Sequence, residues 1–429
     1  MKGICRLSLF IVLLASCRQP DKIIVSSSFV DSLINHYSAS VAMVTNDSNI
    51  NFWKRRMEAQ PDDYVNGPEY ASALSMRFRL YAGINDLLTA DSLFERSNEA
   101  NREQEPGIFR TLASLNMLQH KFRQADSILQ KAIKIEGPSL PNCFLDFDIS
   151  FELGRYAKAK NLLTSLQLGN SYGYLFRRSK LEHYNGSLDT AITYMLRAAK
   201  KAGNNNYLKQ AALSNAADLY VHKGNLDEAC RLYIESIQTD AGDYHSIMGL
   251  GWIALVHDKN ELLAEKIFQF VSTHSNTPDV LLKWEQLAET KNDSAMKKKY
   301  ADKFVMKVND SKYGGMYSKY LIDLYTGILH EPGKAVMLAE REMYIRPTPQ
   351  VMAWYCWSLF CDNKPGLAYR IYRQFVSGKP LEGLELYYMG KLMAGLQRKY
   401  NAQQFLNAAY KNRYDLSPFK QKDLEHKLD

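Results

Sequence analysis

A short pattern centred on alanine recurs along most of the chain and constrains its fold more than any other feature. The alanines lie 31 to 40 residues apart, and most intervals are close to 34. They are Ala90, Ala125, Ala159, Ala191, Ala229, Ala264, Ala335, Ala368 and Ala402, with a degenerate unit at Ala295 in the widest gap. Similarity at a fixed period indicates a chain built from stacked structural units, and about ten are expected here.

Each alanine stands inside a helical pattern. Most units carry a large residue four positions after the alanine, and often a small residue three positions further on. The large residues are Phe94, Leu129, Leu163, Met195, Tyr233, Phe268, Tyr372 and Leu406, and the small ones include Ala132, Ala198, Ser236 and Ala409. Because positions i, i+4 and i+7 share one stripe of an α-helix, the pattern predicts a helix that interlocks with its neighbours.

A second amphipathic segment precedes each alanine, and a short polar joint separates the two. Joints such as 185–188 (NGSL) and 223–226 (KGNL) supply the glycine and asparagine that end one helix and allow the next to begin. Each unit is therefore predicted to be a pair of helices joined by a tight turn, and the fold class all-α. A helical bundle without repeats is the alternative.

The length and pattern of the unit resemble the tetratricopeptide repeat (TPR) family. The residues that carry the resemblance best are Ala217, Tyr220, Gly224, Ala229 and Ser236 in one unit, and Ala113, Ala125, Ala132 and Gly137 in another. The resemblance covers roughly residues 70–415 and implies a right-handed superhelical α-solenoid of about ten TPR-like repeats. Trp252 and Phe147 depart from the family pattern, because they stand where small residues are expected.

The N-terminus is predicted to be a lipoprotein signal peptide, residues 1–16. Lys2 and Arg6 precede an apolar run of eight residues, 7–14, which would rise roughly 12 Å as a helix, too little to cross a bilayer core of about 30 Å. The following sequence, 14–17 (LASC), resembles the bacterial lipobox. That resemblance implies cleavage before Cys17 and lipidation of its sulfur. A plain signal peptide with a nearby cysteine is the alternative.

The rest of the chain divides around the repeat array. Residues 17–25 are predicted to be a lipidated tether, and residues 26–69 an N-terminal helical cap over the first repeat. The repeats span 70–415, and 416–429 form a C-terminal capping helix. Caps are expected at both ends, because the outer repeats of a solenoid have no neighbour to cover their apolar faces.

Charge and cysteine content argue against several classes of function. The formal net charge of +8 falls to about +6 without the signal peptide, and no basic run exceeds Lys297–Lys299, so a nucleic-acid partner is not expected. Four cysteines remain besides Cys5 and Cys17: Cys143, Cys230, Cys356 and Cys361. Buried small residues are the favoured role for them, over a disulfide or a metal site.

No constellation typical of catalysis or metal binding stands out. The segment 169–173 (GNSYG) matches a nucleophile motif by letter, but it joins two helices instead of following a strand. His183, His222 and His257 recur near the ends of first helices, which is a repeat position and not a ligand spacing. The sequence therefore predicts a non-catalytic protein without metal or cofactor.

The TPR resemblance also implies a binding surface, because first helices line the concave face in that family. The corresponding residues here are Arg110, Ser114, Phe144, Asp148, Phe176, Lys180, His183, Asp218, Trp357, Tyr387 and Lys391. Aromatic faces mixed with single charges suit an extended peptide or an exposed helix. For Phe144, Phe176 and Trp357 the alternative is a role in the core between repeats.

These features together predict a protein-interaction scaffold at the bacterial cell envelope. The protein would be exported, lipid-anchored to the outer membrane or envelope, and would bind protein or peptide partners on its concave face. The alternative is a glycan-binding lipoprotein associated with an outer-membrane transporter. Proteins of that kind carry long insertions between few repeats, whereas this chain has short joints between regular units, so the scaffold is favoured.

Overall fold

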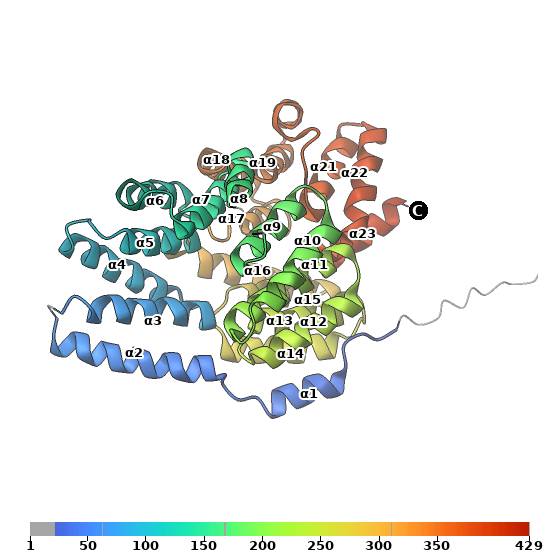
Figure 1. Ribbon diagram of the computed structural model, residues 1–429. Helices are drawn as coiled ribbons and strands as arrows, with labels where there is room; N and C mark the ends of the chain where they lie inside the picture. The colour runs from blue at the N-terminus through green and yellow to red at the C-terminus, as the bar shows by residue number, and fades with distance from the viewer. Residues whose placement is uncertain (1–21, 62, 167–168, 310, 429) are drawn as a thin grey trace, which may run out of the picture.

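The computed structural model describes residues 22–61, 63–166, 169–309 and 311–428, and within them the chain is helical throughout, with no strand. Ten consecutive helical pairs form a TPR-like superhelical stack (Figure 1), so the predicted fold class is confirmed. The predicted signal peptide and Cys17 lie outside the described residues.

The pairs follow one another without a break. Their first helices are α3 (Asn66–Tyr81), α5 (Pro106–Leu118), α7 (Leu140–Glu152), α9 (Tyr172–Tyr184), α11 (Asn206–Lys223), α13 (Tyr244–Val256), α15 (Asp279–Thr290), α17 (Ser318–Thr326), α19 (Pro349–Cys361) and α21 (Gly383–Gly395). Their second helices are α4 (Ile84–Ala100), α6 (Phe122–Glu136), α8 (Tyr156–Ser165), α10 (Leu188–Lys201), α12 (Leu226–Thr239), α14 (Glu261–His274), α16 (Ser294–Val308), α18 (Pro332–Ile345), α20 (Pro365–Ile371) with the π-helical turn η2 (Tyr372–Val376), and α22 (Lys399–Lys411). Outside the pairs lie α1 (Ser27–Asn35), α2 (Val41–Ala59), η1 (Ser311–Tyr313), η3 (Arg413–Asp415) and α23 (Pro418–Leu428).

One residue in the left-handed backbone region closes the first helix of every pair. These residues are Ala82, His120, Gly154, Gly186, Gly224, Lys259, Asn292, His330, Asn363 and Gln397. In the pair α11–α12 the next residue, Asn225, donates its N–H to the carbonyl of Tyr220 at 3.0 Å, which satisfies a free carbonyl at the helix end. The turn therefore repeats in geometry even where the sequence offers no glycine.

The alanine pattern packs as predicted. Nine of the alanines, all except Ala295, are buried, and so are the large residues four positions on. The helix that faces these large residues must approach them closely. At Gly251, for example, an added Cβ would come within 2.6 Å of the Phe268 ring. Small residues at these seams let neighbouring helices interlock, and larger ones would overpack them.

The structure corrects the prediction that Ala295 is the central alanine of a repeat unit. Ala295 is exposed, and the position equivalent to the other alanines is taken by Lys297, the fourth residue of α16. Lys297 forms ion pairs with Glu285 at 3.6 Å and with Glu289, while Ala301 and Phe304 fill the core in reversed order of size. The prediction failed because it aligned the unit on an alanine, whereas a partly buried lysine occupies the seam here.

The superhelix closes on itself, so that late repeats pack on early ones. Arg346 at the α18–α19 joint forms an ion pair with Glu152 of α7 at 3.6 Å, and α18 and α19 come next to α7 and α8 (Figure 1). Asn276 donates its N–H to the carbonyl of Tyr81 at 2.8 Å. One apolar cluster joins side chains of α2–α5 to side chains of α15–α23.

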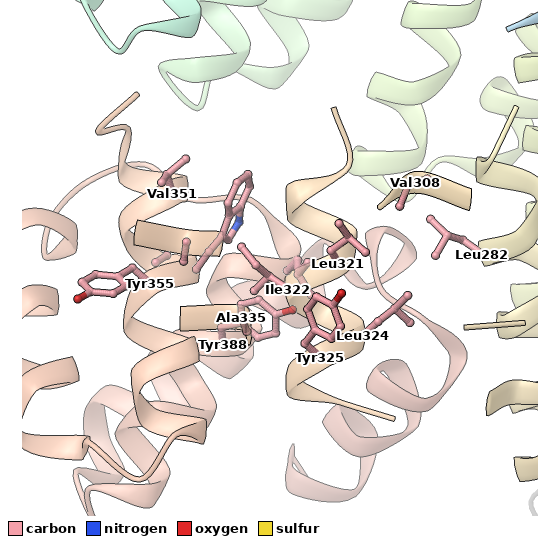
Figure 2. Packing of buried hydrophobic residues seen from close by; sticks show 14 of the residues in the cluster. Leu282, Val308, Leu321, Ile322, Leu324, Tyr325, Ala335, Val351, Tyr355 and Tyr388 are labelled. Atoms are coloured by element: carbon pink, nitrogen blue, oxygen red, sulfur yellow. The ribbon is translucent and has the colours of Figure 1, made fainter. Parts of the chain in front are cut away.

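Figure 2 shows part of this shared core around α17. Leu321, Ile322 and Tyr325 of α17 lie between Ala335 and Tyr388 on one side and Leu282 and Val308 on the other. All seven are buried. These seven residues belong to α15–α21, and the same cluster continues into α3–α5 through Leu74, Leu87 and Leu115, so one core joins the first repeats to the last.

The N-terminal segment differs from the predicted cap. Helix α2 packs on α3, but α1 does not cover the first repeat: it lies on α14, where Asp31 pairs with Lys266 at 2.6 Å. The predicted tether is also too long, because Ile24 and Val25 donate their N–H groups to Asp258 at 3.0 and 2.8 Å. The sequence pattern could not indicate these contacts, which join residues more than 200 positions apart.

Candidate binding site

The inward faces of the first helices enclose two chambers, with volumes of about 680 and 660 Å³. Chamber one lies among α7, α9, α17, α19 and α21, and chamber two among α11, α13 and α15. His222, Tyr320 and Asp415 line both and form the wall between them. The concave face of the superhelix is thus hollowed by two chambers that are partly open to solvent.

Chamber one is lined by charges that compensate one another. Lys180 pairs with Glu152 at 3.2 Å, and Lys319 lies 3.5 Å from Glu385 and 3.8 Å from Glu382. Burial alone would lower the pKa of Lys319, but the two glutamates raise it above its ordinary value. With its cations already paired, this chamber has little charge left to attract a ligand.

The wall between the chambers contains a strong ion pair. His222 Nδ1 lies 2.6 Å from Asp415, and the His222 ring stacks on His183 at 5.1 Å. Burial would lower the pKa of His222, but Asp415, with Glu382 and Asp218 nearby, raises it to about 9. Burial and, after it, the charge of His222 lower the pKa of His183. The pair therefore joins a charged His222 on α11 to the segment that follows α22.

Stability is expected to fall as pH rises from about 6.5 to about 9, because the folded chain holds a proton on His222 that the unfolded chain releases above pH 6.5. The contribution is complete below pH 6.5, is lost as pH passes 9, and amounts to at most about 3 kcal/mol. Urea midpoints of the wild type and His222→Gln, measured from pH 6 to 10, should converge at high pH. A constant difference between the two proteins would contradict this prediction.

Chamber two contains carboxylates that already have donors. Asp218 accepts hydrogen bonds from the Tyr233 hydroxyl at 2.6 Å and from His245 Nε2 at 2.9 Å. The charge of Asp218 raises the pKa of His245 to about 9, although the His245 side chain is 58% exposed inside the chamber. The other carboxylates of the chamber also accept hydrogen bonds. Asp240 accepts from the backbone N–H of Gly242, Asp243 from Ser236 and Ser246, Asp279 from Thr277 and Tyr317, and Asp415 is paired with His222.

Lys283 differs from these groups, because it forms no ion pair with a carboxylate of the described residues. Its Nζ lies 4.0 Å from the centre of the Trp252 ring and 3.4 Å from the Gln286 side-chain oxygen. Burial lowers the pKa of Lys283 to about 8, and the charges of Asp279 and Asp218 only partly offset this. Lys283 is thus a cation of chamber two that is available to an acceptor on a ligand.

Lys283 is therefore expected to react with amine-acylating reagents at unusually low pH. Labelling with an acetyl donor, followed by peptide mass spectrometry, should reach half its maximal rate at Lys283 near pH 8. The Lys283→Met variant identifies the labelled peptide. Half-maximal labelling near 10.5, the ordinary value for lysine, would contradict the lowered pKa.

The chain's own C-terminal segment fills part of the concave face. The Trp252 indole N–H donates to the Tyr414 carbonyl at 2.8 Å, and Tyr414 and Asp415 line chamber two. Further on, Asp423 accepts hydrogen bonds from Tyr387 at 2.8 Å and Lys391 at 3.0 Å. A polypeptide segment therefore already occupies the face on which the sequence predicted a partner.

Five of the predicted concave residues lie at the chambers or against the C-terminal segment. Lys180 and His183 line chamber one, Asp218 lines chamber two, and Tyr387 and Lys391 hold the C-terminal segment. Three of the five therefore line the chambers and two contact α23, and binding by any of them stays a prediction.

The other six lie elsewhere on the repeats. Trp357 stacks on Tyr388 at 4.9 Å and Phe176 packs beside the core, as in the alternative role. Phe144 lies beneath the Arg177 guanidinium, which also pairs with Asp148. Arg110 pairs with Glu136, and the Ser114 hydroxyl donates to the Arg110 carbonyl.

Several interior residues were not predicted from the sequence. His222 was assigned to a repeat position only, and His245, Lys283 and Trp252 were not candidates. One signal was present: Trp252 stands where the repeat pattern expects a small residue, and that departure marks the contact with Tyr414. The histidines gave no such signal, because the partner of His222 lies 193 residues away.

The described residues contain no group of three or more His, Cys, Asp or Glu side chains placed to hold a metal ion, and none of their helices has the length and apolarity of a membrane span. Cys143, Cys230, Cys356 and Cys361 are free thiols, two of them fully buried. Ser171 of the nucleophile-like segment caps α9, where it accepts a hydrogen bond from Tyr174 N at 3.3 Å.

Comparisons find likeness in fold alone. No family model and no curated protein matches the sequence. A chain of the APC/C hetero-tetramer Cut9–Hcn1 is 15% identical, with 89% of this chain and 69% of that chain covered and a TM-score of 0.49. A tetratricopeptide repeat protein from Parabacteroides merdae is 15% identical, with 55% and 91% covered and a TM-score of 0.38. The human IFIT1 dimer with PPP-AAAA is 13% identical, with 77% and 76% covered and a TM-score of 0.46.

Proposed function

We propose that the protein is a non-catalytic interaction scaffold of the bacterial cell envelope, anchored by a lipid on Cys17, whose interior face binds segments of partner proteins. The observation that carries this proposal is the C-terminal segment of the chain itself. It lies on the concave face as a bound polypeptide, held by Trp252, Tyr387 and Lys391. The same face can hold other polypeptides through the same kinds of contact.

The lipid anchor would hold this scaffold close to the membrane. The described chain begins at Lys22, which pairs with Asp227 of α12 at 2.8 Å. Five residue steps separate Cys17 from Lys22, and at about 3.5 Å each they span no more than roughly 18 Å. The outer side of the stack at α12 would therefore lie near the bilayer.

Site-specific photo-crosslinking in envelope membranes tests the binding face. A photoreactive amino acid replaces Tyr207, which is 37% exposed at chamber two, or Tyr400, which is 82% exposed on α22 outside both chambers. We expect covalent adducts with a partner protein from position 207 that are missing from position 400. Identical adduct patterns at the two positions, or none at position 207, would argue against an interior binding face.

A further inference from the structure

Helix α23 packs on α22 of the last repeat and also contacts α15, α17 and α21. Its Lys420 pairs with Asp323 of α17 at 2.9 Å, and the Phe419 N–H donates to Glu289 of α15 at 2.9 Å. One turn further on, Asp423 is bound by Tyr387 and Lys391 of α21. We call this surface of Glu289, Asp323, Tyr387 and Lys391 the α23 groove.

Polar contacts dominate the seating of α23. Of its apolar side chains Leu424 is fully buried, while Phe419 is 59% exposed. Burying one leucine stabilises by only about 1.5–3 kcal/mol, and part-exposed ion pairs add little because water competes for them. Segments with few buried apolar contacts open locally at low free energy, so α23 is expected to leave its groove far more often than the repeats unfold.

We propose that the α23 groove is a docking site for a helix of a partner protein, which takes the place of α23. The partner helix carries the pattern that α23 shows: a lysine, an aspartate three positions later and a leucine directly after it, as in Lys420, Asp423 and Leu424. The groove sets this pattern because Asp323 needs a cation and Tyr387 and Lys391 need an acceptor. This inference rests on the function proposed above and names the partner's chemistry.

Displacement of α23 has a consequence for the interior. Tyr414 and Asp415, four and three residues before Pro418, line chamber two, and Asp415 also lines chamber one. A partner helix in the groove would therefore loosen the segment that separates the chambers. Docking at the groove and access to the chambers are coupled through the short stretch 412–417.

A synthetic fluorescent peptide of residues 416–429 tests the proposal with the full mature chain. In the wild type the tethered α23 competes at an effective concentration in the millimolar range, so the added peptide binds weakly. The double variant Lys420→Glu, Asp423→Lys repels its own groove but leaves all groove residues intact. We expect the peptide to bind this variant at least tenfold more tightly than the wild type, as measured by fluorescence anisotropy.

The matched control is the double variant Lys422→Glu, Glu425→Lys, which makes the same exchange of charge at two exposed positions of α23. It should bind the peptide as weakly as the wild type does. Equal peptide binding by all three proteins, or no saturable binding by the opened variant, would overturn the proposal.

A second measurement covers the case in which the opened variant does not fold. Hydrogen exchange of the wild type should show the α23 amides exchanging at least a hundredfold faster than those of α21. Protection of α23 equal to that of α21 would also overturn the proposal. Photo-crosslinking at position 207 tests the proposed function independently, because it detects partner proteins whether or not they bind in the α23 groove.

Discussion

Replacing Phe268 by alanine is expected to lower the free energy of unfolding by about 3–5 kcal/mol, because the ring fills a closely packed site between three helices. Phe268 of α14 is fully buried, faces Gly251 of α13, and meets Trp284 of α15 edge-on at 6.3 Å. Gly251 has no side chain to fill the space that the ring leaves, and the Trp284 indole N–H is held by the Ser272 hydroxyl at 3.0 Å. Since domains are stable by only about 5–15 kcal/mol, the urea midpoint should fall sharply.

Phe52→Ala is the matched control for this change. Phe52 of α2 is 46% exposed, and its truncation should alter stability by no more than about 0.5 kcal/mol. Far-UV circular dichroism during urea unfolding measures both variants. Equal urea midpoints for Phe268→Ala and Phe52→Ala would contradict close packing of the Phe268 ring between α13, α14 and α15.

The repeat architecture could be predicted from the sequence because the residues that pack each unit lie close together in the chain. The pattern of an alanine followed four positions later by a large residue, as in Ala229 and Tyr233, lies within one helix and can therefore be recognised in the sequence. The unit containing Lys297 shows the limit of this signal. There the seam contains an ion-paired lysine, and the apolar pattern alone points to the wrong register.

Closure of the superhelix could not be predicted, because it depends on the sum of small rotations between successive repeats. A few degrees per repeat decide whether α18 reaches α7, and no single residue records that angle. The ion pair between Arg346 and Glu152 appears only once closure is given. For the same reason the predicted concave residues divide between chamber walls, the α23 groove and the core.

The candidate site was visible only where a repeat position carried an unusual residue. Trp252 was recognised as a departure from the family pattern, and it contacts the C-terminal segment. Lys283 and His245 are ordinary residues in their own helices, and their properties arise from burial beside Trp252 and Asp218. Electrostatic environments of this kind come from the fold and not from the local sequence.

Cys17→Ala is expected to move the protein from the membrane fraction to the soluble fraction, because the proposed lipid anchor depends on this one sulfur. Each buried methylene contributes about 0.8 kcal/mol, so two or three acyl chains hold a protein firmly, whereas without them only weak surface attraction would remain. Fractionation of envelopes, with mass spectrometry of the N-terminal peptide, measures both retention and the added lipid.

Cys143→Ala, which changes a half-buried thiol of α7, should stay in the membrane fraction and serves as the control. A wild-type protein that is cleaved and released without lipid would instead support the plain signal peptide. That outcome would remove the membrane from the proposed function, because the net charge of about +6 is spread over the surface and cannot replace an anchor. The interior face and the α23 groove would then have to find their partners in solution, where no shared membrane raises the local concentration of either one.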